Sequence, residues 1–125
     1  MNRIKSPIVL STWKHGYNAN LKAYDTLIKG GCALDAIENG INIAELDPEV
    51  RTVGYGGYTD DKGEVTLDAC IMDYEGNAGS VVFLKDIMHP ISVARKIMEN
   101  SNHVMLAGKG AQEFALKNGF KKENI

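Results

Sequence analysis

TVGYGGYTDDKGEVTLDACIMDYEGNAGS, residues 52–80, is the stretch around which the rest of the chain is organised. Three glycines between positions 54 and 57 indicate backbone that takes positive φ or lies against another backbone segment. Apolar and polar side chains then alternate over residues 65–72, which is the period of a β-strand. A turn-forming segment at 73–77 leads into a second apolar run at 80–84. The two runs therefore predict a β-hairpin.

The two faces of the first strand differ in chemistry. One face carries only apolar side chains: Val65, Leu67, Ala69 and Ile71. The other carries Thr66, Asp68, Cys70 and Met72 and no lysine, so we expect both faces of the strand to be covered. An unpaired buried carboxylate would cost several kcal/mol or take up a proton, so hydrogen bonds should hold Asp68. Two roles stay open for Asp68, a structural carboxylate bonded to nearby amides or a direct part in catalysis.

The whole-chain numbers describe an ordinary globular domain. The 125 residues are 44% hydrophobic and 24% charged, which is enough for one domain with its own core. A net charge of −2 argues against nucleic acid or an anionic membrane as a partner. No apolar run approaches the roughly 20 residues that span a bilayer. The apolar run at 8–10, after a slightly basic start at residues 1–5, is too short for a signal peptide, so a cytoplasmic location is expected.

The cysteines and histidines give no sign of a metal site. Cys32 and Cys70 are too few and too distant for a disulfide framework; a bond between them is an alternative that a reducing cytoplasm disfavours. His15, His89 and His103 form no ligand pair of the spacing that holds zinc. We therefore expect neither a metal nor a cofactor.

Apolar periodicity places the other elements. The residues before the central stretch predict a strand over 7–13, a helix from a cap at Asn18 or Asn20 to Lys29, and a second helix that Pro48 ends. The first helix should present Leu21, Tyr24, Leu27 and Ile28 on one face and stop at Gly30-Gly31, and the second should present Leu34, Ile37, Ile41 and Ala44, with close packing at Gly40. The residues after the hairpin predict a helix that starts at Pro90, a buried strand over 103–107, and a helix over 110–118 that stops at Gly119 and Phe120.

The resulting order, β-α-α-β-β-α-β-α, is that of an α+β fold. Four short strands make a modest sheet, and neither end of the chain offers anything to cover its edges. We therefore expect this chain to be incomplete, and to be poorly stable or self-associating when alone.

Three ordered motifs carry a family resemblance. They are Leu10-Ser11-Thr12-Trp13, Thr52-Val53-Gly54-Tyr55-Gly56-Gly57 and Thr66-Leu67-Asp68-Ala69-Cys70-Ile71-Met72-Asp73. Together with Pro90-Ile91-Ser92-Val93-Ala94-Arg95, they resemble the glycosylasparaginase branch of the N-terminal-nucleophile asparaginase family. The plant-type branch usually begins with His-Gly-Gly-Ala-Gly, which is absent here.

The resemblance implies a fold, a reaction and a partner. The fold would be a four-layer αββα sandwich, of which residues 1–125 would be the α-subunit portion of a single domain. The precursor in this family cuts itself before a threonine, whose hydroxyl then attacks the side-chain amide of glycosylasparagine with its own α-amine as the base. The nucleophile would therefore lie on a C-terminal (β) chain outside these residues, and the complete protein would be a dimer of α/β units. Asp25-Thr26 is no cleavage site, because cutting there would sever a predicted helix.

The resemblance also assigns roles near the substrate, which would be a small-molecule glycosylasparagine or asparagine. Trp13 would line the substrate pocket, with a core tryptophan as the alternative. Thr52 would support the nucleophile by a hydrogen bond, and Ser11 and Thr12 would serve the site or satisfy strand ends. No catalytic residue is expected within these residues. Two other functions stay open: a truncated, inert or scaffolding piece, and an asparaginase or β-aspartyl peptidase specificity.

Overall fold

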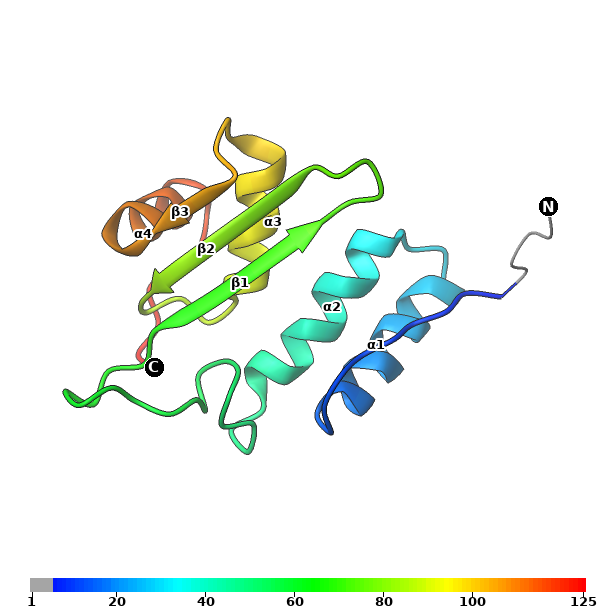
Figure 1. Ribbon diagram of the computed structural model, residues 1–125, viewed down its shortest axis with the longest axis horizontal. Coiled ribbons are helices and arrows are strands. Elements are labelled where there is room, and N and C mark those ends of the chain that lie inside the picture. Colours follow the sequence, from blue (N-terminus) through cyan, green and yellow to red (C-terminus); the bar gives the residue numbers. More distant parts are fainter. Residues whose placement is uncertain (1–5) are drawn as a thin grey trace.

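A computed structural model describes residues 6–125, so the basic start at residues 1–5 lies outside the described residues. The chain forms a helical hairpin beside a small sheet that has two helices on one face (Figure 1). In chain order the elements are α1 (Gly16–Ile28), α2 (Ala33–Leu46), β1 (Leu67–Met72), β2 (Ala78–Leu84), α3 (Pro90–Asn100), β3 (Met105–Ala107) and α4 (Gly108–Lys117). This mixture of helices and strands confirms the predicted α+β class. The sheet has three strands.

The predicted hairpin is present. β1 and β2 pair antiparallel, and β3 pairs parallel to the other side of β2, which gives the order β1-β2-β3. The connecting turn is built on Asp73, whose Oδ1 accepts the amides of Glu75 and Asn77 at 2.9 Å each. An aspartate at this position holds its own turn through its side chain, as the sequence chemistry indicates.

Asp68 lies opposite a bulge in β2. The register shifts between Leu67 and Ala69, and Phe83 takes a φ of +54°. The displaced amide of Phe83 donates to Asp68 Oδ1 at 2.8 Å. The prediction of a hydrogen-bonded Asp68 is confirmed, whereas its expected burial is wrong, because no layer formed by residues 6–125 covers this side of the hairpin.

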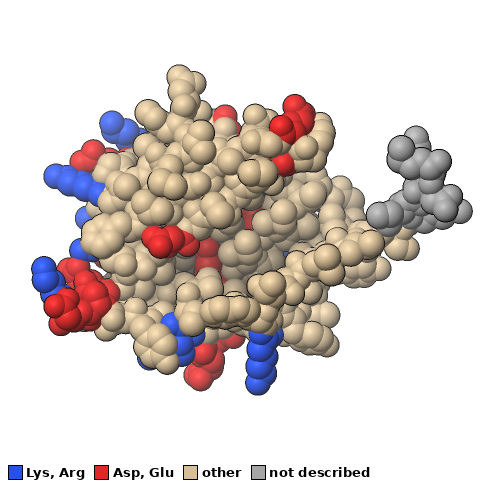
Figure 2. Space-filling model, in the orientation of Figure 1, with Lys and Arg blue, Asp and Glu red and all other residues tan. Residues whose placement is uncertain are grey.

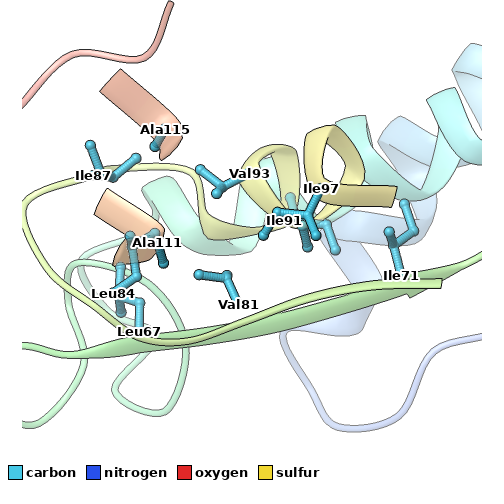
Figure 3. Close-up of a cluster of buried hydrophobic side chains, with 11 residues drawn as sticks. Leu67, Ile71, Val81, Leu84, Ile87, Ile91, Val93, Ile97, Ala111 and Ala115 are labelled. Atoms are coloured by element: carbon cyan, nitrogen blue, oxygen red, sulfur yellow. The ribbon is translucent and has the colours of Figure 1, made fainter. Parts of the chain in front are cut away.

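The core lies between the sheet and the helices α3 and α4 (Figure 3). Helix α3 begins with Pro90, as predicted, and turns an apolar stripe of Ile91, Ala94, Ile97 and Met98 onto β1 and β2. The fully or nearly fully buried residues of this cluster are Leu67, Ile71, Val81, Leu84, Ile87, Ile91, Val93, Ala94, Ile97, Ala111 and Ala115.

The opposite face of the sheet is open to solvent among the described residues. Met72 is 62% exposed, and Cys70 on the same face of β1 is exposed too. Met105 and Ala107 of β3 share this exposure, so the expectation of a buried strand there is wrong. The alternation along β1 is as predicted, but the second covering layer is not supplied by residues 6–125.

The predicted strand over residues 7–13 does not form. These residues are extended or bent but pair with no strand, and Leu10 is 89% exposed. In Figure 1 they run as a thin blue segment along α1. A strand needs a neighbour to satisfy its amides and carbonyls, and none of the described strands lies beside this segment. The described residues therefore hold three strands, not four.

Helix α1 starts earlier than predicted and buries another face. Its N-cap is His15, so the predicted caps at Asn18 and Asn20 are wrong. The face packed on α2 carries the small residues Ala19 and Ala23. Of the predicted apolar stripe, Leu21, Tyr24 and Ile28 are exposed and Leu27 is half-buried. The stop is as predicted: the amides of Gly30 and Gly31 close on the carbonyls of Leu27 and Thr26, with Gly30 at a φ of +93°.

Helices α2 and α4 end as the sequence predicts. Asp47 caps α2 in extended geometry directly before Pro48. Gly40 packs tightly as expected, because a Cβ there would lie 2.7 Å from the carbonyl oxygen of Ala19. At the end of α4, the amide of Phe120 returns to the carbonyl of Ala115 at 3.0 Å, and Phe120 packs against the core.

The contact between α3 and the sheet yields a prediction at Gly79. A Cβ at Gly79 would lie 2.1 Å from the carbonyl oxygen of Ala94 and 2.6 Å from the amide nitrogen of Met98. Gly79→Ala should therefore lower the free energy of unfolding by about 1–3 kcal/mol or more, measured by urea denaturation followed by circular dichroism.

A matched substitution exists on α4. Gly110 has a helical backbone and open space where its Cβ would stand. Gly110→Ala should leave the fold intact and raise stability by up to about 1 kcal/mol. Equal effects of the two substitutions would show that α3 does not approach the sheet this closely.

Candidate functional site

The largest surface hollow near the motif residues brings Trp13 and Thr52 together. It has a volume of about 850 Å³ and lies between the start of α1 and the loop that follows α2. We call it the Trp13–Thr52 hollow; its lining consists of Trp13, Lys14, His15, Tyr17, Asn18, Asp47, Glu49, Val50, Arg51 and Thr52. Two residues from separate sequence motifs therefore share one concave surface.

Trp13 stands in solvent at the edge of this hollow. Its side chain is 70% exposed, and its backbone has a φ of +66°, which is unusual for a bulky residue. The carbonyl of Trp13 accepts the amide of Gly16 at 3.2 Å, so this bend leads directly into α1. The indole meets the ring of His15 edge to face, with centroids 5.7 Å apart and planes at 78°. The alternative of a core tryptophan is therefore wrong.

The other wall is a tightly turned loop, which we call the 47–58 loop. Asp47 begins it and accepts the amide of Glu49 on Oδ1 at 2.9 Å and that of Val50 on its carbonyl at 3.1 Å. Val50 is buried beneath the loop. At the far end, the amide of Tyr58 donates to the carbonyl of Arg51 at 3.0 Å. Thr52 is held exposed between these two closures.

The glycine cluster fixes the base of this loop. Gly54 has a φ of +75°, and a Cβ on it would lie 2.4 Å from the carbonyl oxygen of Glu45. The amide of Tyr55 donates to that same carbonyl at 3.4 Å. Gly56 packs as closely on Pro48, where a Cβ would lie 2.6 Å from the carbonyl oxygen. Both uses of glycine that the sequence indicates, positive φ and close backbone approach, are present.

Ser11 and Thr12 lie at a neighbouring hollow, and Asp68 lies elsewhere. The second hollow, of about 510 Å³, is lined by Ser11 and Thr12 and shares His15 with the Trp13–Thr52 hollow. The hydroxyl of Ser11 donates to the side-chain oxygen of Asn20 on α1. Asp68 sits on the open face of the hairpin. The structure thus brings four of the five predicted site residues to adjacent hollows.

Sequence reasoning missed a buried ionic pair between α2 and α3. Glu45 is only 1% exposed; its Oε2 lies 2.8 Å from His89 Nδ1, and its Oε1 accepts the amide of Ile91 at 2.9 Å. The sequence contains a sign of this pair. Glu45 follows Ile37 and Ile41 at helical spacing, so it lies on the face of the helix that is expected to be apolar. A carboxylate at such a position implies a partner from another element.

Both members of this pair have shifted pKa values. Burial raises the pKa of Glu45, against the hydrogen bonds from His89 and the Ile91 amide, which lower it. The hydrogen bond to Glu45 raises the pKa of His89, against its partial burial. The pKa of His89 rises because the Glu45 carboxylate is in direct contact with the imidazole and favours its charged form.

A second ionic cluster joins the same two helices. Arg95 Nη1 on α3 lies 2.8 Å from Asp35 Oδ1 and 2.8 Å from Glu38 Oε2 on α2, and its Nε bonds Glu99 at 2.9 Å. Burial lowers the pKa of Arg95, but the three carboxylates outweigh it and raise the pKa overall. The hydrogen bond from Arg95 also lowers the pKa of Asp35. Arg95 is therefore charged throughout the range in which proteins are handled.

Three further features of residues 6–125 concern metal ligands, membrane spans and disulfides. From residue 6 to residue 125, no three His, Cys, Asp or Glu side chains gather in a way that could hold a metal ion. Within the same range, none of the helices has both the length and the apolar character needed to cross a bilayer. Cys32 and Cys70 are both free, so the alternative of a disulfide between them is wrong.

The shifted pKa of His89 predicts how stability depends on pH. Because the pKa is raised on folding, the folded protein keeps a proton that the unfolded chain releases near pH 6.5. The stabilisation is fully present below about pH 6.5 and is lost as pH rises through the folded value. The raised pKa of Glu45 acts in the same direction. The free energy of unfolding, from urea titrations, should be lower at pH 9 than at pH 6.

His89→Asn is the control for this prediction. It keeps a side-chain N–H that can face Glu45 but cannot titrate. Its free energy of unfolding should change less between pH 6 and pH 9 than that of the unmodified chain. The same slope in both proteins would assign the pH dependence to other groups.

Comparison with known proteins adds a family and several relatives. Residues 9–125 match the Asparaginase family. The N(4)-(Beta-N-acetylglucosaminyl)-L-asparaginase of Elizabethkingia miricola is 60% identical over 119 residues, covering 95% of this chain and 35% of that protein. The protein of the same name from Rattus norvegicus is 43% identical over 120 residues, with 95% and 34% covered. The isoaspartyl peptidase/L-asparaginase of Xenopus laevis is 37% identical over 111 residues, with 87% and 36% covered.

All three relatives are much longer than this chain. The chain spans about a third of the length of the curated relatives it matches, and it corresponds to their N-terminal part.

Proposed function

The chain belongs to the asparaginase family, and on that premise we propose that it is the N-terminal part of an amidohydrolase that cleaves the side-chain amide of glycosylasparagine and releases aspartate. The relatives with the highest identity quoted above carry the name of that activity. The observation that carries the proposal is the Trp13–Thr52 hollow. Two exposed motif residues, one before α1 and one after α2, line a concave surface of about 850 Å³.

In this proposal the reactive group comes from a second polypeptide. The hydroxyl of an N-terminal threonine on a C-terminal (β) chain attacks the amide carbonyl carbon, and its own α-amine takes the hydroxyl proton. The C–N bond breaks as the proton passes to the leaving nitrogen, which leaves an aspartyl ester on the threonine. Water then hydrolyses the ester, releases aspartate and restores the hydroxyl.

The residues of this chain would form the wall around that reaction. Trp13 would pack against the substrate, and Thr52 would support the threonine by a hydrogen bond. Ser11 and Thr12, at the adjacent hollow, would hold the segment that carries Trp13. Asp68 would support the site from the sheet, where its bond to the Phe83 amide fixes the bulge.

We further propose that residues 1–125 are one portion of a single four-layer αββα domain. Helices α3 and α4 cover one face of the sheet, and the other face is open. In Figure 2, which keeps the orientation of Figure 1, most of that face is uncharged, a few acidic groups lie in its middle, and the basic groups lie at its rim. Such a face suits a second sheet, and the unpaired segment at residues 7–13 suits a neighbouring strand. The complete protein would be a dimer of α/β units; a cytoplasmic location stays a prediction.

A second specificity has direct support. The Xenopus laevis relative is named isoaspartyl peptidase/L-asparaginase and is 37% identical to this chain. Cleavage of asparagine or of β-aspartyl peptides is therefore the alternative reaction for the same wall. An inert or scaffolding piece is the outcome expected if no complementary chain restores activity.

Complementation tests the proposal. The chain alone should not hydrolyse glycosylasparagine. Co-expressed with the C-terminal two thirds of the Elizabethkingia miricola protein, it should co-purify with that fragment and release aspartate, detected in a coupled assay. Co-purification without turnover of glycosylasparagine, asparagine or β-aspartyl peptides would leave only a scaffolding role.

A matched pair of substitutions tests the wall. Trp13→Ala should raise KM for glycosylasparagine about tenfold or more, because an exposed aromatic in a pocket supplies about 1–3 kcal/mol of contact energy. Tyr74→Ala removes an aromatic ring from the hairpin turn that is even more exposed than Trp13, at 95%. It should leave KM unchanged. An unchanged KM in Trp13→Ala would show that Trp13 does not contact the substrate.

A further inference from the structure

Glu45 connects the 47–58 loop to the start of α3. The carbonyl oxygen of Glu45 accepts the Tyr55 amide and abuts Gly54, so the backbone of Glu45 supports the glycine turn. The side chain of the same residue bonds His89 Nδ1 and the Ile91 amide at the start of α3. Glu45 thus joins the wall of the Trp13–Thr52 hollow to the helix that packs on the sheet.

We propose that the Glu45–His89 pair is the positioning element of the Trp13–Thr52 hollow, and that loss of the imidazole charge loosens the 47–58 loop. Neither side chain lines the hollow; both act through the loop backbone. The inference rests on the proposed function only in treating this hollow as part of the substrate pocket.

Geometry makes Glu45 a directional anchor. Two separate donors, one on each carboxylate oxygen, fix both the position and the rotation of the carboxylate. Hydrogen bonds to a charged group contribute more to stability than hydrogen bonds between neutral groups. If one partner is removed, the remaining buried charge is unpaired, and its full desolvation cost destabilises the fold. Because α2 ends one residue after Glu45, a shift of this carboxylate moves the start of the loop.

The charges around the pair decide the direction of the pH effect. Glu38 of α2 and Glu123 of the C-terminal segment face His89 in addition to Glu45, and all three favour the charged imidazole. Glu38 is itself bonded to Arg95 of α3, which moderates its effect on His89. Losing the imidazole proton leaves the Glu45 carboxylate buried without a counter-charge. The anchor should therefore be firm near pH 6 and weaker near pH 9.

Trp13 provides a direct readout on the wall, because it is the single tryptophan of the sequence. Its emission should change in a transition centred above pH 6.5, the ordinary pKa of histidine, as His89 loses its proton. The ring of His15 lies against the indole and can quench its emission, so the measurement is made in a His15→Gln background. In that background, Glu45→Gln should abolish the transition. Glu113→Gln, an exposed carboxylate on α4, should leave it unchanged.

Amide hydrogen exchange at a fixed pH separates positioning from general stability. At pH 6, Glu45→Gln should speed exchange at the amides of Tyr55 and Tyr58 by about ten- to a hundredfold, the effect of losing a charged hydrogen bond. Exchange at Ile97, in the middle of α3, should change far less. His89→Asn at pH 6 should reproduce the loop exchange of the unmodified chain at pH 9, after correction for intrinsic rates.

Two results would overturn the inference. One is a Trp13 transition that persists in Glu45→Gln or His89→Asn. The other is exchange that accelerates by one common factor at Tyr55, Tyr58 and Ile97, which would make the pair merely structural. No readout here uses substrate, so a failed amidase assay counts against the proposed function and not against the anchor.

Discussion

The buried carboxylate of Glu45 is the constraint on which the arrangement of the two halves depends. The helical hairpin α1–α2 packs internally through small residues, and the sheet packs internally on α3 and α4. Between these units, ionic contacts join α2 to α3, namely Glu45 with His89, and Arg95 with Asp35 and Glu38. Leu34 and Ile41 of α2 add apolar contacts with the core. Figure 1 shows the two units side by side, with α2 and α3 between their outer elements. A directional interface therefore sets where the 47–58 loop stands relative to the sheet.

The open surfaces of the molecule follow from the same arrangement. Helices α3 and α4 cover one face of the sheet and form the core with it. On the opposite face of the sheet, Cys70, Met72 and Met105 are exposed to solvent. The apolar stripe of α1 is also exposed, because its small-residue face is the one used by α2. Uncovered apolar surface on several sides is unusual for a monomer that stands alone. It fits a chain that spans about a third of its relatives.

Local chemistry was predictable from the sequence, and what depends on contacts between distant segments was not. The hairpin, the Pro90 start of α3 and the glycine stops at Gly30 and Gly119 are written in short-range patterns, and they form as predicted. The strand over 7–13 failed because strand formation needs a pairing partner, which no local pattern supplies. The motifs led to Trp13 and Thr52, which share a hollow, but Glu45 escaped notice because a lone carboxylate on an apolar stripe shows its partner only in three dimensions.

The choice of an ionic tie at Glu45 has a physical rationale. Well-packed apolar side chains at the α2–α3 contact would stabilise the fold as well as a buried ion pair, since desolvation offsets much of the attraction between the charges. Apolar contacts are non-directional, however, and permit α2 to rotate or slide on α3. Two hydrogen bonds to one carboxylate permit neither, because each fixes a distance and an angle. The residues that follow this helix line the Trp13–Thr52 hollow, so a fixed orientation of α2 also fixes the place of that lining.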